Sequence, residues 1–129
     1  MTVKTYDIEL RQGERVRALL TPALYGVASR KGIDLTAEIN GASKDVTAMA
    51  RAYAKMAYCA AINQWEVERV DNPSAPDFAY SFSDFDTWSW ENQKDLLGFI
   101  DAVLLAFTGK GLSEQKEAAG EGLKKKTRK

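Results

Sequence analysis

Polar and apolar positions alternate along the first twenty residues, which is the pattern of short strands with one buried face. Residues 3–10 alternate polar with β-favouring side chains, and residues 14–20 repeat the alternation. Gln12 and Gly13 lie between the two runs and favour a turn. The pattern predicts a β-hairpin. A helix that begins near Glu14 is the alternative, since Arg, Ala and Leu also favour helices.

Two helical signals follow the hairpin. Thr21 before Pro22 is typical of an N-cap followed by the first helical position, and Gly32 is typical of a helix end. These residues predict a helix over residues 22–31. Residues 35–39 predict one further helical turn.

The clearest helical pattern begins at Ser43 and Asp45, two residues that suit a helix N-terminus. From there, apolar or aromatic residues recur at steps of three and four: Val46, Met49, Ala50, Tyr53, Met56, Ala57 and Ala60. Residues 64–71 fit either a continuation of this helix or a short strand, and local signals leave both open. Two prolines then predict a loop over residues 71–76.

Residues 78–90 form an aromatic and acidic segment. Ser83, three residues ahead of Asp86, resembles a capping box and predicts a short helix there, with Phe85 and Trp88 on one face. Aromatic side chains can stack nucleic-acid bases, but the acidic character of the segment opposes phosphate. Packing in the core is therefore the favoured interpretation, and an interface is the alternative.

The last helical pattern covers residues 91–108 and is strongly apolar. One face carries Leu96, Phe99, Ile100, Val103 and Phe107, and this face is widened by Leu97, Leu104 and Leu105. A helix this apolar either lies at the centre of the core or needs a partner to cover its second side.

Together these elements predict an α+β fold, in which an N-terminal β-hairpin packs on a small bundle of three to four helices. Residues 1–109 are expected to form a single domain. A chain of 129 residues can bury an ordinary hydrophobic core without disulfides or metals as staples.

The charges are balanced in number but unevenly distributed. The chain has 18 basic and 18 acidic residues. Residues 110–129 contain seven basic and three acidic residues, so this segment carries +4 and residues 1–109 carry −4. The segment also lacks the apolar residues whose burial would offset the entropy of ordering. We therefore expect a flexible, disordered basic tail.

Missing residue types exclude several classes of function. The chain has no histidine, so it has no imidazole base, no Ser-His-Asp triad and no zinc site that uses histidine. The single Cys59 cannot form an internal disulfide, and its alanine-rich surroundings predict a small core residue. The first residues contain none of the uninterrupted apolar run that a secretory signal needs, and the longest apolar stretch is far shorter than the roughly 20 residues of a membrane span. We expect a cytoplasmic, non-enzymatic protein without cofactors.

Two charged groups have a functional and a simpler interpretation. A cation site is conceivable at Asp77, Asp84, Asp86, Glu91 and Asp95, but their spacing lacks the glycine and later glutamate of a calcium loop, which favours helix capping. Non-specific nucleic-acid binding is conceivable at the basic run Lys124, Lys125, Lys126, Arg128 and Lys129, although a solubilising tail is the commoner explanation.

Several segments occur in a recognisable order along the chain. They are the hairpin, Lys31-Gly32-Ile33, Ala52-Tyr53-Ala54, the segment Phe82 to Trp88, and the apolar final helix. This order resembles the tail assembly chaperones of long-tailed phages and prophages, over most of residues 3–107. The resemblance implies a non-enzymatic protein that binds and solubilises the tape measure protein and helps to recruit tail tube subunits. It also implies a short form and a frameshifted longer form.

On this hypothesis, the candidate partner contacts are Trp88, Trp90, Leu97, Leu104 and Leu105. Aromatic anchors generally contribute most at interfaces. Burial of all five in the monomer's own core is the alternative. A second hypothesis is a small helical adaptor or regulatory protein that binds nucleic acid weakly through its basic tail. The sequence leaves the oligomeric state open, including a homo-oligomer.

Overall fold

The computed structural model describes residues 4–11, 13–41 and 45–109 of the chain. Its elements follow the order β1 (Thr5–Arg11), β2 (Glu14–Leu19), α1 (Ala23–Arg30), α2 (Leu35–Gly41), α3 (Val46–Asp71), α4 (Phe82–Glu91) and α5 (Gln93–Thr108). The predicted α+β class, with an N-terminal hairpin packed on a small bundle of helices, is confirmed. The predicted basic tail and the predicted cap at Ser43 lie outside the described residues.

The hairpin forms where the alternating pattern predicted it. The strands pair antiparallel, with Ile8 opposite Val16, and buried residues alternate with exposed ones. Gly13 in the turn has a φ of 77°, a conformation that other residues rarely adopt. The helix considered from Glu14 is wrong, because Val16 and Ala18 reach the core at the two-residue spacing of a strand.

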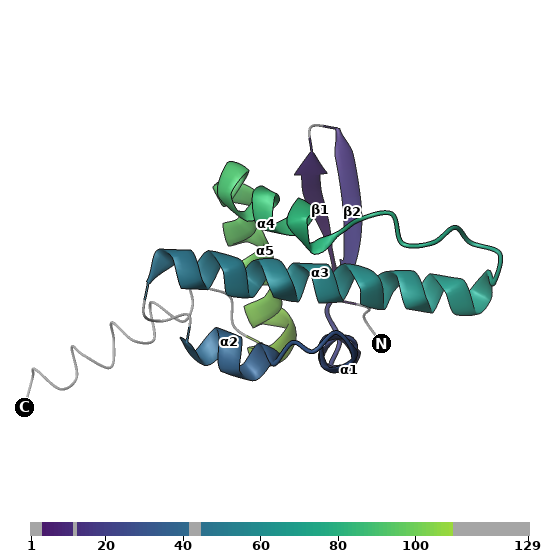
Figure 1. Ribbon diagram of the computed structural model, residues 1–129, viewed down its shortest axis with the longest axis horizontal. Coiled ribbons are helices and arrows are strands. Elements are labelled where there is room, and N and C mark those ends of the chain that lie inside the picture. Colours follow the sequence, from purple (N-terminus) through teal and green to yellow (C-terminus); the bar gives the residue numbers. More distant parts are fainter. Residues whose placement is uncertain (1–3, 12, 42–44, 110–129) are drawn as a thin grey trace, which may run out of the picture.

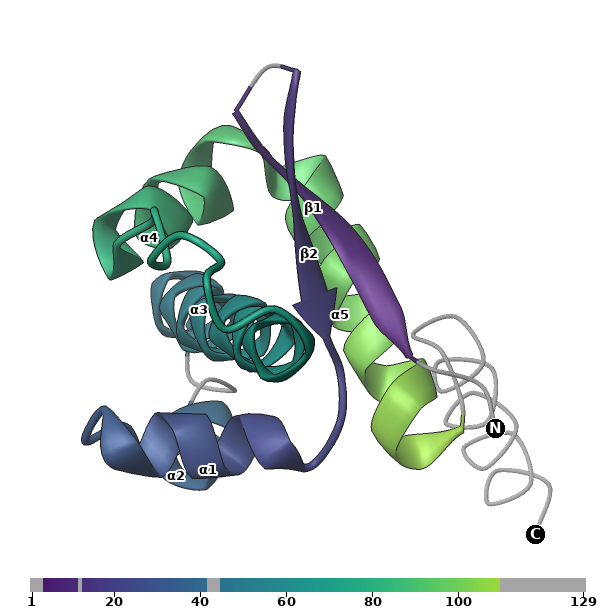
Figure 2. The same ribbon diagram turned by 90° about the vertical axis from the view of Figure 1, so that its right-hand side faces the viewer.

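Helix α3 is the central element, and it contacts α1, α2, α4, α5 and β2. It runs along the longest dimension of the molecule, and the hairpin stands across it (Figure 1). In the view along α3, α1 and α2 lie on one side of this helix and α4 lies on the other, with the hairpin between α4 and α5 (Figure 2). Strand β2 packs on α3 and strand β1 packs on α5, so the hairpin joins the last helix to the central one.

One hydrophobic core is shared by both strands and all five helices. Its largest fully buried side chains include Trp88, Phe85, Phe99, Ile8, Leu24, Leu35 and Met56. The predicted burial of Phe85 and Trp88 on one face of α4 is confirmed. Helix α3 contributes mainly alanines to this core, and their small side chains let the neighbouring helices approach closely.

Helix α3 extends beyond its clearest sequence pattern. It continues to Asp71, so residues 64–71 are helical. The returning loop contacts α3 at Trp65, which packs against Phe78 and whose Nε1 donates a hydrogen bond of 2.9 Å to the carbonyl oxygen of Pro76, whereas residues 67–71 are exposed. These contacts join residues more than ten positions apart, so local sequence signals could not show whether residues 64–71 form a helix or a strand.

Two predicted helix caps are wrong in detail. Pro22, not Thr21, occupies the N-cap position of α1, and the Thr21 hydroxyl instead accepts a hydrogen bond of 3.0 Å from Asn63 Nδ2. The side chain that appeared suited to start a helix is therefore used to tie α3 to the end of β2.

The capping box of α4 lies two residues earlier than predicted. Ser81 and Asp84 form it, with the Ser81 backbone N–H donating to Asp84 Oδ2 at 2.9 Å. The sequence repeats the same Ser-x-x-Asp spacing at Ser83, so capping chemistry alone does not choose between the two. The earlier start adds Phe82 to the helix, where its ring packs against Tyr58.

Candidate functional site

An apolar groove lies between the start of α3, the end of α4 and the first half of α5. Its volume is about 130 Å³, and its lining includes Val46, Met49, Trp90, Gln93, Leu96 and Leu97. The lining has few polar side chains, and one of them, Ser89, already donates a hydrogen bond of 2.7 Å to the Asp86 carbonyl oxygen. The groove therefore offers apolar contact rather than a set of free hydrogen-bonding groups.

Three apolar side chains of this groove are exposed to solvent. The exposed fraction is 65% for Val46, 40% for Trp90 and 50% for Leu97. Single exposed apolar residues are common on soluble proteins, but a contiguous group around a groove is typical of a binding surface. Covering each side chain completely would gain roughly 1.5–3 kcal/mol relative to full exposure, less the part that is already buried.

The corner between α4 and α5 creates this arrangement. Asn92 follows the end of α4 and caps α5, because its Oδ1 accepts a hydrogen bond of 3.2 Å from the Asp95 backbone N–H. Trp88 and Trp90 are two residues apart on one helix, which separates their directions by about 200°. Trp88 consequently faces the core, and Trp90 faces the groove with Leu97.

The five predicted contact residues do not form one surface. Trp90 and Leu97 line the groove, whereas Leu105 is exposed towards the other end of α5. Trp88 is only 1% exposed, and Leu104 is half-buried against the core. The core alternative therefore describes Trp88, and the groove retains two of the five candidates. The basic tail residues Lys124 to Lys129 lie outside the described residues.

Val46 and Met49 are groove residues that the sequence did not single out. The helical pattern assigned both to the inward face of α3, and Met49 is indeed half-buried. Val46 is exposed because α4 and α5 leave the first turn of α3 uncovered. No local signal marks this residue, since its exposure depends on where a corner more than forty residues later in the chain is placed.

Asp95, one of the carboxylates of the conceivable cation site, is a structural junction. Its carboxylate accepts hydrogen bonds from the Tyr6 hydroxyl, from Trp88 Nε1 at 3.0 Å and from the Glu9 backbone N–H at 2.8 Å. Burial, reinforced by the hydrogen bond and charge of Asp95, raises the pKa of Tyr6. These bonds join β1, α4 and α5, and so they hold the corner that presents Trp90. The spacing of Asn92 and Asp95, a capping signature, is the signal that could have identified it.

The other acidic residues of this region have local partners. Asp86 pairs with Arg51 at 3.4 Å, and Asp77 pairs with Arg69 at 3.6 Å. Hydrogen bonding from the Ser81 backbone, followed by the neighbouring Arg11, lowers the pKa of Asp84. Within residues 4–11, 13–41 and 45–109, no three His, Cys, Asp or Glu side chains are grouped so as to hold a metal ion.

Cys59 is fully buried in α3, as predicted for a core residue. Burial raises the pKa of its thiol to about 11, so the side chain is protonated at neutral pH. Among the described helices, none has the length and apolar character needed to cross a membrane.

Comparisons with protein-family models, with curated proteins and with solved structures found no match. In the described part of the chain, exposed apolar side chains from three helices converge at the groove between α3, α4 and α5.

Proposed function

We propose that the protein is a non-enzymatic binding protein that takes an apolar helical segment of a partner into the groove between α3, α4 and α5. The observation that carries this proposal is the exposure of Val46, Trp90 and Leu97 around one apolar groove. An amphipathic helix laid in such a groove inserts side chains spaced three or four residues apart. A volume of about 130 Å³ is close to that of a cavity that holds one benzene-sized group.

In its finer form, the proposal names the protein as a tail assembly chaperone of a long-tailed phage or prophage. Its partner would be the tape measure protein, a long helical chain whose apolar faces need cover before assembly, and it would help to recruit tail tube subunits in the cytoplasm of the bacterial host. This form rests on the resemblance in the order of sequence segments. The absence of histidine supports a binding role over a hydrolytic one.

The test is co-expression with a tape measure protein of a long-tailed phage, followed by size-exclusion chromatography. We expect the wild-type chain to keep that protein soluble and to elute with it. Leu97→Asp should abolish the complex, because a carboxylate would be buried against apolar groove side chains. Trp90→Ala should weaken it at least tenfold, as expected for an aromatic anchor.

Val70→Asp is the matched control, since Val70 is 79% exposed and lies near the end of α3, outside the groove lining. Far-UV circular dichroism establishes that each variant is folded. The proposal fails if the partner aggregates beside the wild-type chain, or if Leu97→Asp and Val70→Asp bind it equally well.

A further inference from the structure

The ladder of the hairpin leaves backbone groups of β2 pointing outwards. The Leu20 N–H donates to the Lys4 carbonyl oxygen at 2.8 Å, which makes residues 4 and 20 a hydrogen-bonded pair. Hydrogen-bonded and non-hydrogen-bonded pairs alternate along an antiparallel ladder. The pairs that contain Arg15 and Arg17 are therefore non-hydrogen-bonded, and the N–H and C=O groups of these two residues face away from β1.

A side chain bonds to the backbone at one end of this outer edge, a contact between two side chains lies at the other end, and the middle is open. At one end, Asn63 Nδ2 donates to the Leu19 carbonyl oxygen at 3.0 Å. At the other end, the Tyr80 hydroxyl donates to Glu14 Oε1 at 2.7 Å. Between them, no group among the described residues pairs with the outward backbone groups of the two arginines.

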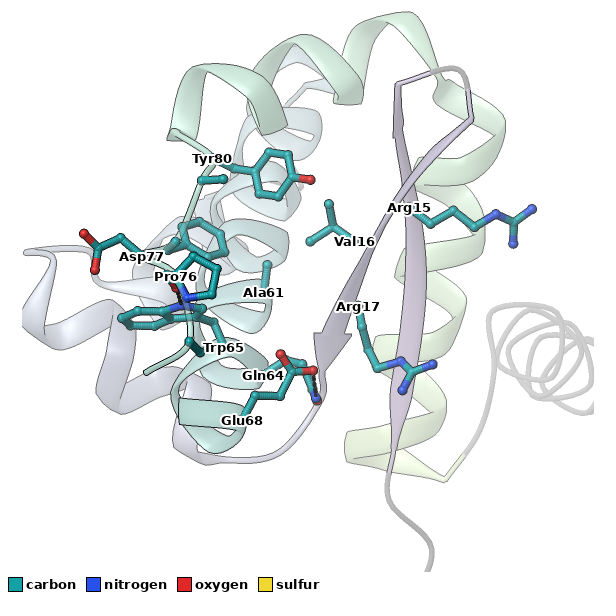
Figure 3. Close-up of a pocket in the computed structure, with 13 residues that line it drawn as sticks. Arg15, Val16, Arg17, Ala61, Gln64, Trp65, Glu68, Pro76, Asp77 and Tyr80 are labelled. Atoms are coloured by element: carbon teal, nitrogen blue, oxygen red, sulfur yellow. Dashed lines mark hydrogen bonds between the residues drawn. The ribbon is translucent and has the colours of Figure 1, made fainter. Parts of the chain in front are cut away.

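The open edge borders a groove of about 290 Å³, drawn in Figure 3. Helix α3 supplies its floor through Ala61 and Trp65, and residues 75–80 form its far wall. The Trp65 side chain fixes this wall, since its Nε1 bonds to the Pro76 carbonyl oxygen at 2.9 Å. The wall of the groove is therefore held in place by a hydrogen bond, and the opposite side of the groove is the edge of β2.

The side chains of β2 define what kind of strand fits. Val16 points towards the groove floor, whereas Arg15 and Arg17 extend to the other face (Figure 3). On the paired side of β2, strand β1 places an acidic residue opposite each of the two arginines. Asp7 lies opposite Arg17, and their side chains form a salt bridge of 3.2 Å. Glu9 lies opposite Arg15 in the same register.

We propose that the outer edge of β2 binds an extended segment of a partner protein as a third strand, with two carboxylates that flank an apolar residue. The backbone groups of Arg15 and Arg17 supply the hydrogen bonds, as in other cases of strand addition. The carboxylates lie beside the two guanidinium groups, and the apolar residue between them lies over the floor with Val16. This surface is separate from the groove between α3, α4 and α5, so the inference goes beyond the proposed function.

Two features of the surroundings select this occupant. Antiparallel pairing of two copies through β2 would place the arginines of one copy beside those of the other, and like charges directly opposite one another are destabilising. Glu68 lines the floor side of the groove, whereas the Asp77 side chain points away from β2 (Figure 3). The Glu68 carboxylate disfavours a third carboxylate at the central position of the segment, where an apolar side chain is preferred.

The test uses two fluorescein-labelled peptides with blocked ends, STDVETS and its lysine twin STKVKTS, titrated with the full chain at low salt. We expect the acidic peptide to bind at least tenfold more tightly in fluorescence anisotropy. In Arg15→Glu the preference should fall at least tenfold or reverse. The backbone amides of Arg15 and Arg17 and the Trp65 indole N–H should shift in heteronuclear NMR spectra on addition of the acidic peptide.

N-methylation along the acidic peptide tests the strand geometry without altering the protein. Methyl groups at alternate positions should abolish binding, because alternate N–H groups face β2, and methyl groups at the positions between them should leave it intact. Equal binding of both peptides, or a loss that does not alternate, overturns the proposal. So does a wild-type dimer in sedimentation velocity that Arg15→Glu alters, because a second copy would then occupy the edge.

Discussion

The two outer edges of the hairpin carry the same kinds of backbone group, but side chains at the start of α5 bond to the edge of β1 at Glu9, whereas the middle of the β2 edge borders a groove. On β1, the Glu9 N–H donates to Asp95 Oδ2 at 2.8 Å, and Asn92 Nδ2 approaches the Glu9 carbonyl oxygen at 3.5 Å. On β2, the corresponding groups of Arg15 and Arg17 meet a groove. Helix α5 packs along β1, whereas α3 lies under the face of β2 and leaves its edge free.

The difference shows how a two-stranded sheet can have one edge stabilised by a helix while the other edge stays open to bind a further strand. Asn92 and Asp95 serve two purposes, because they begin α5 and also satisfy the edge of β1. An open strand edge is an aggregation hazard, which natural proteins limit by keeping it short and charged. The open part of β2 has both properties, since it spans only Arg15 to Arg17, between the Glu14 side chain that Tyr80 contacts and the Leu19 carbonyl that Asn63 bonds.

The largest expected effect comes from truncating Trp88, the buried side chain whose indole N–H bonds to Asp95 behind the edge of β1. Trp88→Ala should lower the free energy of unfolding by about 4 kcal/mol, because it empties a fully buried site and removes a donor to Asp95. Trp90→Ala should lower it by less than about 1 kcal/mol, since the side chain is exposed. Urea denaturation of the two variants measures both values. Similar losses for the two tryptophans would contradict the assignment of one to the core and the other to the groove.

The next largest effect comes from opening the edge of β1 itself. Asp95→Ala should destabilise the protein by about 3 kcal/mol, since it leaves the donors of Tyr6, Glu9 and Trp88 without their acceptor. Glu91→Ala, on the same corner but exposed, is the control and should change stability by less than about 0.5 kcal/mol.

Hydrogen exchange measures the edge directly in the same Asp95→Ala variant. The Glu9 amide should be protected in the wild type and lose that protection in the variant, because its acceptor is gone. The Arg15 and Arg17 amides should exchange readily in both proteins. Unchanged protection of Glu9 in the variant would show that Asp95 does not close this edge.

The sequence predicts most of the fold because the relevant signals are local. The two-residue alternation of the strands and the three- and four-residue spacing of α3 each follow from one element's own burial. The details that were wrong or left open involve contacts between elements. Thr21 bonds to Asn63 rather than capping α1, and residues 64–71, for which helix and strand were both open, are helical and contact the returning loop at Trp65.

The groove was only partly predictable for the same reason. Trp90 and Leu97 could be identified from their apolar character, but Trp88 differs from Trp90 only in the direction that α4 gives it. Val46 gave no signal at all. The edge of β2 was not predictable either, because strand edges become covered or open only when helices such as α5 are placed beside them.

A smaller effect tests the packing of Tyr6 between β1 and α5. A Cβ at Gly98 would lie 2.6 Å from the Tyr6 hydroxyl oxygen, which Asp95 holds in place. Gly98→Ala should therefore destabilise the wild type by about 1 kcal/mol, despite the better helix propensity of alanine. In Tyr6→Phe the nearest ring atom is 3.5 Å away, an ordinary contact, and the same change should stabilise by about 1 kcal/mol.

A double-mutant cycle measured by thermal unfolding gives the coupling between these two positions, expected at about 2 kcal/mol. Additive effects of the two substitutions would mean that the Tyr6 hydroxyl does not occupy the space beside Gly98. Comparing Leu97→Ala with Leu97→Gly, at a half-exposed position of the same helix, controls for the helix propensity term.

The smallest expected effect is a loss of stability at alkaline pH that comes from the phenol of Tyr6, at the junction of β1 with α5. The pKa of Tyr6 is raised above its ordinary value of 10.0, first by burial and then by the hydrogen bond and charge of Asp95. Because the folded state holds this proton more tightly than the unfolded state does, the contribution of Tyr6 is complete below pH 10 and falls as the pH rises above it. The slope cannot exceed about 1.4 kcal/mol per pH unit for one proton, and partial exposure of the ring reduces it.

Urea denaturation of the wild type and of Tyr6→Phe between pH 9 and pH 11 isolates this contribution. Cys59, Tyr53 and Tyr80 also have raised pKa values and add losses of the same sign, but they are present in both proteins and cancel in the difference. The stability advantage of the wild type over Tyr6→Phe should therefore shrink as the pH rises above 10. Parallel pH profiles for the two proteins would mean that the phenol proton is not held at the junction of β1 with α5, and that the edge of β1 is closed by the Glu9 backbone bond alone.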